Sequence, residues 1–127
     1  MEKIEINEDG KVVVANRAML NDSSFNDVSM INVKIVNANL SDLEIEGAQM
    51  GGAYIHNIGM PPEGHPMYDA TARQRPLLFE DCDLRGSIIS GCDLSGVALS
   101  DCIIRGMIIN GVPVEEMLDS YKNAKGQ

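Results

Sequence analysis

The chain has 127 residues, a formal net charge of −9, 44% hydrophobic residues and only 4% aromatic residues. This length is typical of one domain, which we expect to span residues 1–127. The negative charge argues against direct binding to nucleic acids or anionic membranes, because both require Lys and Arg clusters opposite phosphate groups. No apolar run reaches membrane length, and the charged start Met1–Asn7 is unlike a signal peptide, so we expect a cytoplasmic protein.

Residues 1–19 are predicted to form an N-terminal β cap. Apolar residues alternate at Ile4 and Ile6, and Asp9-Gly10 precedes a second apolar run. An Asp-Gly pair between two strand-like runs favours a hairpin, which we place at residues 2–15 and expect to cover the first coil of the repeats that follow. The alternative is a strand edge that exchanges with another subunit.

A first repeat run, residues 20–58, carries a bulky apolar residue at every fifth position. This period matches neither a helix nor a strand and is typical of a solenoid built from five-residue units. With the central residue as position i, position i−2 is mostly small, i+2 is always Gly, Asn or Asp, and i−1 and i+1 are mixed polar. We predict two inward columns, a turn at each i+2 position and two outward columns. The central residues are Phe25, Met30, Ile35, Leu40, Ile45, Met50 and Ile55.

Residues 59–76 interrupt the period and are predicted to form an inserted loop. The segment is rich in Pro and Gly, and loops of this length inside compact domains are often functional. It is a partner-recognition element, a metal site or a solvated insertion. No tight ligand spacing supports the metal site, and no nucleophile–base pair supports an enzyme, so we expect no metal, cofactor or catalysis. The candidate partner-binding residues are His56, His65, Tyr68, Asp69, Arg73 and Arg75.

The second repeat run, residues 77–112, resumes the five-residue period. Its i−2 column contains Cys82, Cys92 and Cys102, which we expect to be reduced thiols acting as small buried hydrophobes. A zinc or redox role is the alternative. The central residues are Phe79, Leu84, Ile89, Leu94, Leu99, Ile104 and Ile109.

Residues 113–127 are predicted to form a short amphipathic α-helix. Val114, Met117, Leu118 and Tyr121 fall at i, i+3, i+4 and i+7, with acidic residues near the start and lysines near the end. We expect this apolar stripe to lie over the last coil. A homodimer through the helix, or through an end coil, is the rival interpretation and is compatible with the first.

Units such as Cys82-Asp83-Leu84-Arg85-Gly86 and Cys92-Asp93-Leu94-Ser95-Gly96 resemble those of the pentapeptide-repeat family. The resemblance implies a right-handed quadrilateral β-helix with four units per coil and therefore about 3.5 coils, or a rod of about 17 Å at the strand spacing. Ordering five residues costs about 5–10 kcal/mol and burying one Leu contributes about 1.5–3 kcal/mol, so coils must stabilise one another.

The function expected from these features is a non-enzymatic scaffold or interaction module of unassigned role that binds a protein partner. Some members of the family protect or inhibit DNA gyrase through acidic rods that resemble duplex DNA, so the resemblance also suggests a DNA-mimicking modulator. A third alternative is a small-molecule or metal binder that uses the loop at residues 59–76.

Overall fold

The computed structural model of the chain describes residues 2–126; Met1 and Gln127, at the outer ends of the predicted cap and helix, lie outside the described residues. The chain divides into two compact units, Met1–Asn57 and Ile58–Gln127. The first unit ends one residue before the predicted end of the first repeat run, residue 58.

A left-handed backbone corner recurs at every fifth residue in both repeat runs. Every residue of the predicted i+2 column, from Asp27 to Asn57 and from Asp81 to Gly111, has φ between 53° and 81°. Gly, Asn and Asp tolerate this region at the smallest steric cost, so the predicted turn column is confirmed. Asp22 and Arg17 continue the phase with φ of 66° and 49°, so the five-residue period begins before residue 20.

Two kinds of corner alternate along the chain. In one kind a backbone hydrogen bond spans the corner, as at Asp42, where Leu43 N donates to Leu40 O at 3.1 Å. A positive φ at the third residue of such a turn is what a type II turn requires. In residues 2–126 no such bond spans the intervening corners, for example those at Asp27 and Asn37, so a ten-residue period is superimposed on the five-residue one. The other hydrogen-bonded corners lie at Asp22, Gly52, Gly86, Gly96 and Gly106, whereas the corner at Asn32 has the same turn without this bond.

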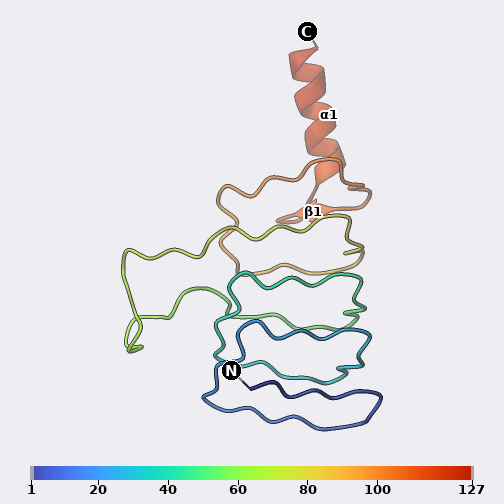
Figure 1. Ribbon diagram of the computed structural model, residues 1–127. Coiled ribbons are helices and arrows are strands. Elements are labelled where there is room, and N and C mark those ends of the chain that lie inside the picture. The colour runs from blue at the N-terminus through green and yellow to red at the C-terminus, as the bar shows by residue number, and fades with distance from the viewer. Residues whose placement is uncertain (1, 127) are drawn as a thin grey trace. The chain divides into compact units, whose positions relative to one another are not determined.

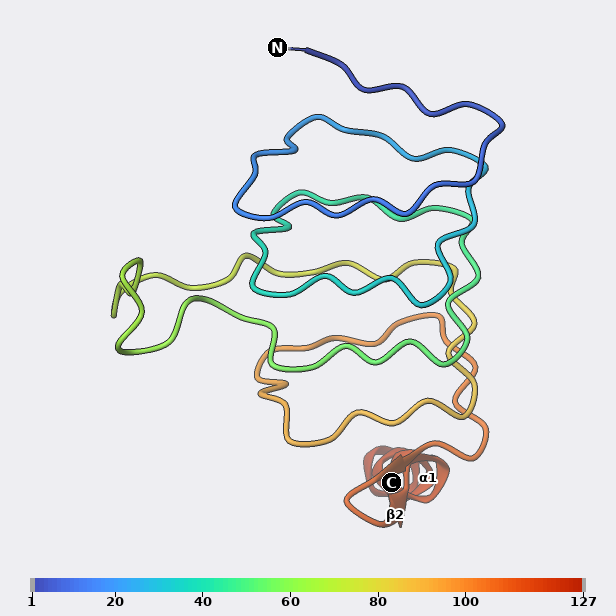
Figure 2. The same ribbon diagram turned by 90° about the horizontal axis from the view of Figure 1, so that it is seen from below.

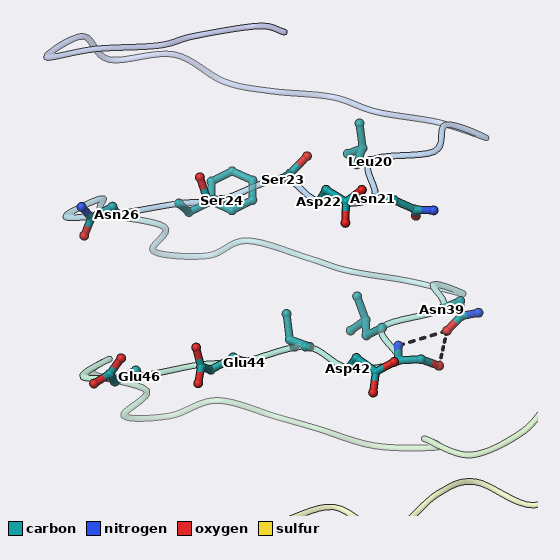
Figure 3. A pocket seen from close by; sticks show the side chains of 14 residues that line it. Leu20, Asn21, Asp22, Ser23, Ser24, Asn26, Asn39, Asp42, Glu44 and Glu46 are labelled. Atoms are coloured by element: carbon teal, nitrogen blue, oxygen red, sulfur yellow. Dashed lines mark hydrogen bonds between the residues drawn. The ribbon is translucent and has the colours of Figure 1, made fainter. Parts of the chain in front are cut away.

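Within each unit the chain winds through successive open loops (Figures 1 and 2). In the first unit, Ser24 lies above Glu44 and Asn26 above Glu46 (Figure 3), so residues twenty positions apart are brought into register. Four five-residue units per winding account for this register. However, no backbone hydrogen bond joins one winding to the next in the part of the chain that the structure describes, and residues 2–107 contain no assigned strand.

The central apolar residues are exposed rather than buried. None of residues 2–126 is buried, and Phe25 and Leu94 remain 65% and 53% exposed. The two inward, packed columns and the coils of a closed β-helix are therefore not confirmed. The reason is that the described hydrogen bonds in the repeats are local, so neighbouring windings do not close onto each other's apolar side chains.

The predicted N-terminal cap is also not confirmed. No strand is assigned within residues 2–15, and the left-handed residue in this segment is Glu8, with φ of 52°, which lies before the Asp9-Gly10 pair expected at the hairpin turn. Asp9 and Lys11 form an ion pair where the turn was expected. Because an isolated two-stranded hairpin is marginal in water, it needs a closed coil to pack against, and the open windings do not form one.

The second unit ends in a β-hairpin that the five-residue pattern does not predict. Strands β1 (Ile108–Ile109) and β2 (Val112–Pro113) are antiparallel, with Ile108 opposite Pro113 and Ile109 opposite Val112. The connecting pair Asn110-Gly111 has φ of 48° and 81°, as a type I′ turn requires. Gly111 also belongs to the i+2 column, which is why the repeat phase masked the hairpin in the sequence.

Helix α1 (Val114–Lys125) follows directly and confirms the predicted C-terminal helix. Pro113 is the residue before the first turn, the first turn holds Glu115 and Glu116, and the last turn holds two lysines, which suits the helix dipole. The backbone N–H of Gly126 donates to Lys122 O at 2.7 Å and ends the helix.

The apolar stripe of α1 is left uncovered in the second unit. Val114 is half-buried, whereas Met117, Leu118 and Tyr121 are exposed. Within this unit α1 projects away from the windings and is seen end-on in Figure 2. The expected packing of the stripe over the last coil is therefore not confirmed.

Candidate functional site

The segment at residues 59–76 leaves the windings of the second unit and projects to one side (Figures 1 and 2). It is organised as a series of local turns. His65 N donates to Pro62 O at 3.0 Å, Tyr68 N donates to His65 O at 2.9 Å, and Ala72 N donates to Asp69 O at 3.2 Å. We call residues 59–76 the insertion loop.

Two side chains of the insertion loop hold its own backbone. His65 Nδ1 accepts a hydrogen bond from Met67 N at 3.0 Å, which leaves Nε2 as the outer ring nitrogen. Asp69 Oδ1 accepts from Thr71 N at 2.9 Å and from Thr71 Oγ1 at 2.8 Å. The hydrogen bonds from the backbone and side chain of Thr71 lower the pKa of Asp69, so its carboxylate is ionised and already used as an acceptor.

The two arginines of the candidate set lie at the end of the insertion loop. Arg73 Nη1 donates to Ala70 O at 3.0 Å and to Ala72 O at 2.9 Å, so this guanidinium fastens the last turn. Arg75 is exposed. The structure therefore places His65, Asp69 and Arg73 in internal roles, and Tyr68, 44% exposed, on the surface.

His56 belongs to the other compact unit and is described separately from the insertion loop. Its ring stacks on Tyr54, with 4.0 Å between ring centroids and 14° between planes, and its Nδ1 lies 3.0 Å from Asn57 Oδ1. Tyr54 was not among the predicted site residues. The sequence did contain a signal for this contact. Tyr54 and His56 lie two residues apart, at positions i−1 and i+1, and therefore share one face of an extended chain.

The donor groups of the described residues do not assemble into a conventional metal site. No group of three or more His, Cys, Asp or Glu side chains that could hold a metal ion occurs in residues 2–126.

A gap of about 880 Å³ separates two windings of the first unit. Residues 20–26 line one wall and residues 39–46 the other, with Asp22, Asp42, Glu44 and Glu46 among them (Figure 3). Asn39 Oδ1 accepts hydrogen bonds from Ser41 N at 3.0 Å and Ser41 Oγ at 2.6 Å. This bonding keeps the wall's backbone in its turn.

A second gap, of about 690 Å³, lies within the second unit and is more apolar. Its walls are residues 87–99 and 107–110, which are offset by twenty positions at Ser87 and Met107. Both gaps therefore lie between segments that a twenty-residue register would bring together.

The end of the second repeat run is anchored to the helix that follows. Gly106 N donates to Glu115 Oε1 at 3.0 Å, and Val114 N donates to Met107 O at 3.0 Å. Ile104, Met107 and Val114 are half-buried here.

The three cysteines are exposed free thiols, not the buried hydrophobes expected from the i−2 column. Their exposure follows from the open windings, which leave this column in contact with solvent. Each thiol donates to the carbonyl oxygen two residues earlier, at 3.3 Å for Cys82, 3.5 Å for Cys92 and 3.2 Å for Cys102.

Comparison with known proteins connects these repeats to a family. No helix in residues 2–126 has the length and apolar character needed to span a bilayer. No curated protein and no solved structure matches the chain. Residues 78–112 match the family described as Pentapeptide repeats, in eight copies. This match confirms the resemblance seen in the sequence for the second repeat run: residues 78–112 are pentapeptide repeats, with a left-handed corner at every fifth residue.

Proposed function

We propose that the chain is a non-enzymatic pentapeptide-repeat scaffold that binds a protein partner through the insertion loop. The observation that carries the proposal is the internal bonding of this loop. Its turns are held by His65 and Asp69, and Arg73 fastens its end. Because this order exists before binding, little conformational entropy is lost when a partner docks.

The contact surface in this proposal is centred on Tyr68 and Met67, with the outer nitrogen of His65 beside them. Met67 is 73% exposed and follows directly on the His65 turn. Tyr and Met are enriched at protein interfaces because they combine large contact area with few lost rotamers or with an adaptable shape. Asp69 and Arg73 support this surface from within the loop.

The scaffold in this proposal is a closed right-handed quadrilateral β-helix of about 3.5 coils. A corner at every fifth residue, an alternation of corner type at every tenth and a register of twenty in the first unit support it. If successive windings approach to about 4.8 Å, their backbones pair and the central apolar residues become buried. Such closure removes the exposed apolar surface, which monomeric soluble proteins rarely retain.

The loop proposal is tested by immobilising the full chain and quantifying the proteins it captures from a lysate. We expect a Met67→Ser/Tyr68→Ala variant to lose at least about 90% of a specific partner, as interface hot spots do. The matched control is Ile88→Ala, which removes a similarly exposed apolar side chain from the repeats. Equal capture by all three chains would show that the insertion loop does not contact the partner.

A homodimer through α1 is a second proposal, favoured by the exposed stripe of Met117, Leu118 and Tyr121. An antiparallel helix pair would also place the acidic first turn of each copy opposite the basic last turn of the other. Light scattering on a sizing column is expected to give a dimer that Met117→Glu converts into a folded monomer. A monomer for the unaltered chain would contradict this interface.

A further inference from the structure

The three cysteines occupy equivalent positions in the second repeat run. Each follows a corner that has no spanning backbone hydrogen bond, at Asp81, Gly91 or Asp101. Each Sγ–H donates to the carbonyl two residues earlier, over distances that differ by only a few tenths of an ångström. The three thiols therefore leave the backbone in the same local geometry.

The spacing of the cysteines then decides which of them can meet. Cys82 and Cys102 are twenty residues apart, the separation at which the first unit brings side chains into register (Figure 3). Cys92 lies half a winding from each. In the closed β-helix of the proposed scaffold, on which this step rests, Cys82 and Cys102 are neighbours on adjacent coils at about 4.8 Å and Cys92 lies on the opposite side.

Two parallel thiols at this spacing suit a metal ion better than a disulfide. A disulfide needs the two Cβ atoms about 3.5–4.5 Å apart, whereas parallel side chains in register keep them near the strand spacing. A Zn–S bond is about 2.3 Å long, and two metal–thiolate bonds of similar length in line span about 4.6 Å. Soft thiolate ligands select soft cations such as Cu(I).

We propose that Cys82 and Cys102 form a two-coordinate site for a soft monovalent cation of the Cu(I) or Ag(I) class. On binding, both thiols release their protons to solvent and two sulfur–metal bonds form. The Sγ–H···O bonds to the carbonyls of Glu80 and Ser100 are lost, and no electron is transferred. The bound ion joins two adjacent coils of the second run.

The site is tested by titrating the full chain with Ag(I) in chloride-free buffer without oxygen, with native mass spectrometry for stoichiometry and X-ray absorption for the ligands. We expect one ion per chain with two sulfur ligands and release of two protons. Cys82→Ser and Cys102→Ser should each weaken binding by about 100-fold or more, because the second thiolate is then no longer held on the same scaffold. Cys92→Ser is the matched control and should leave affinity within about twofold, since Cys92 provides no ligand.

Three outcomes would overturn the proposal. The first is an equal loss of Ag(I) affinity in all three single variants. The second is Ag(I) binding that persists in the Cys82→Ser/Cys102→Ser double variant. The third is a chain that forms a Cys82–Cys102 disulfide in air and, when reduced, has no affinity for Ag(I). Amide hydrogen exchange on the metal-free chain separates this failure from that of the scaffold. Protected central residues without selective Ag(I) binding overturn the metal site alone, whereas absent protection also overturns the closed β-helix.

Discussion

The two repeat runs have the same backbone corners but differ in the side chains that make them. Corners of the first run are mostly Asp or Asn, as at Asp22 and Asn32, whereas those of the second are mostly Gly, as at Gly86 and Gly96, and all four have positive φ. The family match covers the second run, residues 78–112, and not the first. The two runs therefore share the same corner geometry, although the family match covers only the second.

In both runs the residue before the central Leu accepts a hydrogen bond from the backbone two residues later. In the second run, Asp83 and Asp93 each accept a hydrogen bond from the backbone N–H two residues later, at 3.1 and 3.0 Å. In the first run, Asn39 forms this bond in the unit Ala38-Asn39-Leu40-Ser41-Asp42. A short acceptor before the central Leu therefore stabilises the next turn in either run.

The runs also end differently. The second run closes with β1, β2 and α1, and Glu115 binds the backbone of Gly106. The first run passes into the insertion loop at the unit boundary. The half-buried repeat residues Ile104 and Met107 both lie next to the corner at Gly106, so partial burial in the repeats occurs where the following helix bonds to the run.

The largest test of this comparison removes the central Leu of one unit in each run. If the proposed windings close, Leu40→Ala and Leu94→Ala should each lower the free energy of unfolding by about 2–5 kcal/mol in urea titrations, as loss of a packed Leu does. The control Ile88→Ala, at an outward position, should change it by less than about 0.5 kcal/mol.

Each other result has a definite meaning. Losses below about 0.5 kcal/mol for both Leu variants would show that the windings remain as open as the 47% and 53% exposure of these side chains indicates. A large loss for Leu94→Ala alone would show that only the anchored run closes.

The sequence predicts local features better than long-range ones. The corner column and α1 are confirmed because each follows from residues within one turn of each other. Packing of the coils and the N-terminal cap depend on contacts between residues about twenty positions apart, which a five-residue pattern does not specify. The Asn110-Gly111 hairpin had a local signal that the repeat phase concealed.

In the candidate site, too, the local feature was predicted and the contacts of individual side chains were not. The insertion loop was predicted from its breakers, but the internal roles of His65, Asp69 and Arg73 depend on which backbone groups they reach. A list of polar residue types does not contain that information. For the same reason the sequence grouped His56 with the loop, although it lies in the other compact unit.

A smaller effect is expected when the two kinds of corner residue are altered. Gly96 has φ of 74°, and a Cβ added there would meet no atom within 4 Å. Gly96→Ala should therefore cost about 1–2 kcal/mol in thermal unfolding through backbone strain alone. Asp22→Gly in the first run should change stability by less than about 0.5 kcal/mol, because relief of strain offsets the greater freedom of the unfolded chain. Equal losses of stability for both variants would contradict the view that Asp22 and Gly96 both occupy left-handed corners in which Gly is the least strained residue.

The smallest expected effect is a difference in pH dependence between two turns, one in each run. In each of them an Asp or Asn side chain accepts a hydrogen bond from the backbone N–H two residues later. Arg85 Nε and Nη2 donate to the Asp83 carboxylate at 3.0 and 2.7 Å, and its backbone N–H donates as well. These bonds, the side-chain ones foremost, lower the pKa of Asp83 from 3.8 to about 2. A carboxyl whose pKa is lower in the folded state stabilises that state above pH 3.8, and this stabilisation is lost as pH falls towards 2.

In the first run Asn39 does not titrate, so its turn should persist through this pH range. An NMR titration of the side-chain carboxyl carbons checks the difference. Arg85→Ala should raise the pKa of Asp83 only part of the way back to 3.8, because the backbone N–H at position 85 still donates to the carboxylate. Lys34→Ala, which removes a cation from the other compact unit, is the control and should leave the pKa of Asp83 unchanged. A pKa of Asp83 that is unaffected by Arg85→Ala would show that the Arg85 side chain does not stabilise the carboxylate, and the two runs would then share the backbone bond to the acceptor and differ only in the charge of that acceptor.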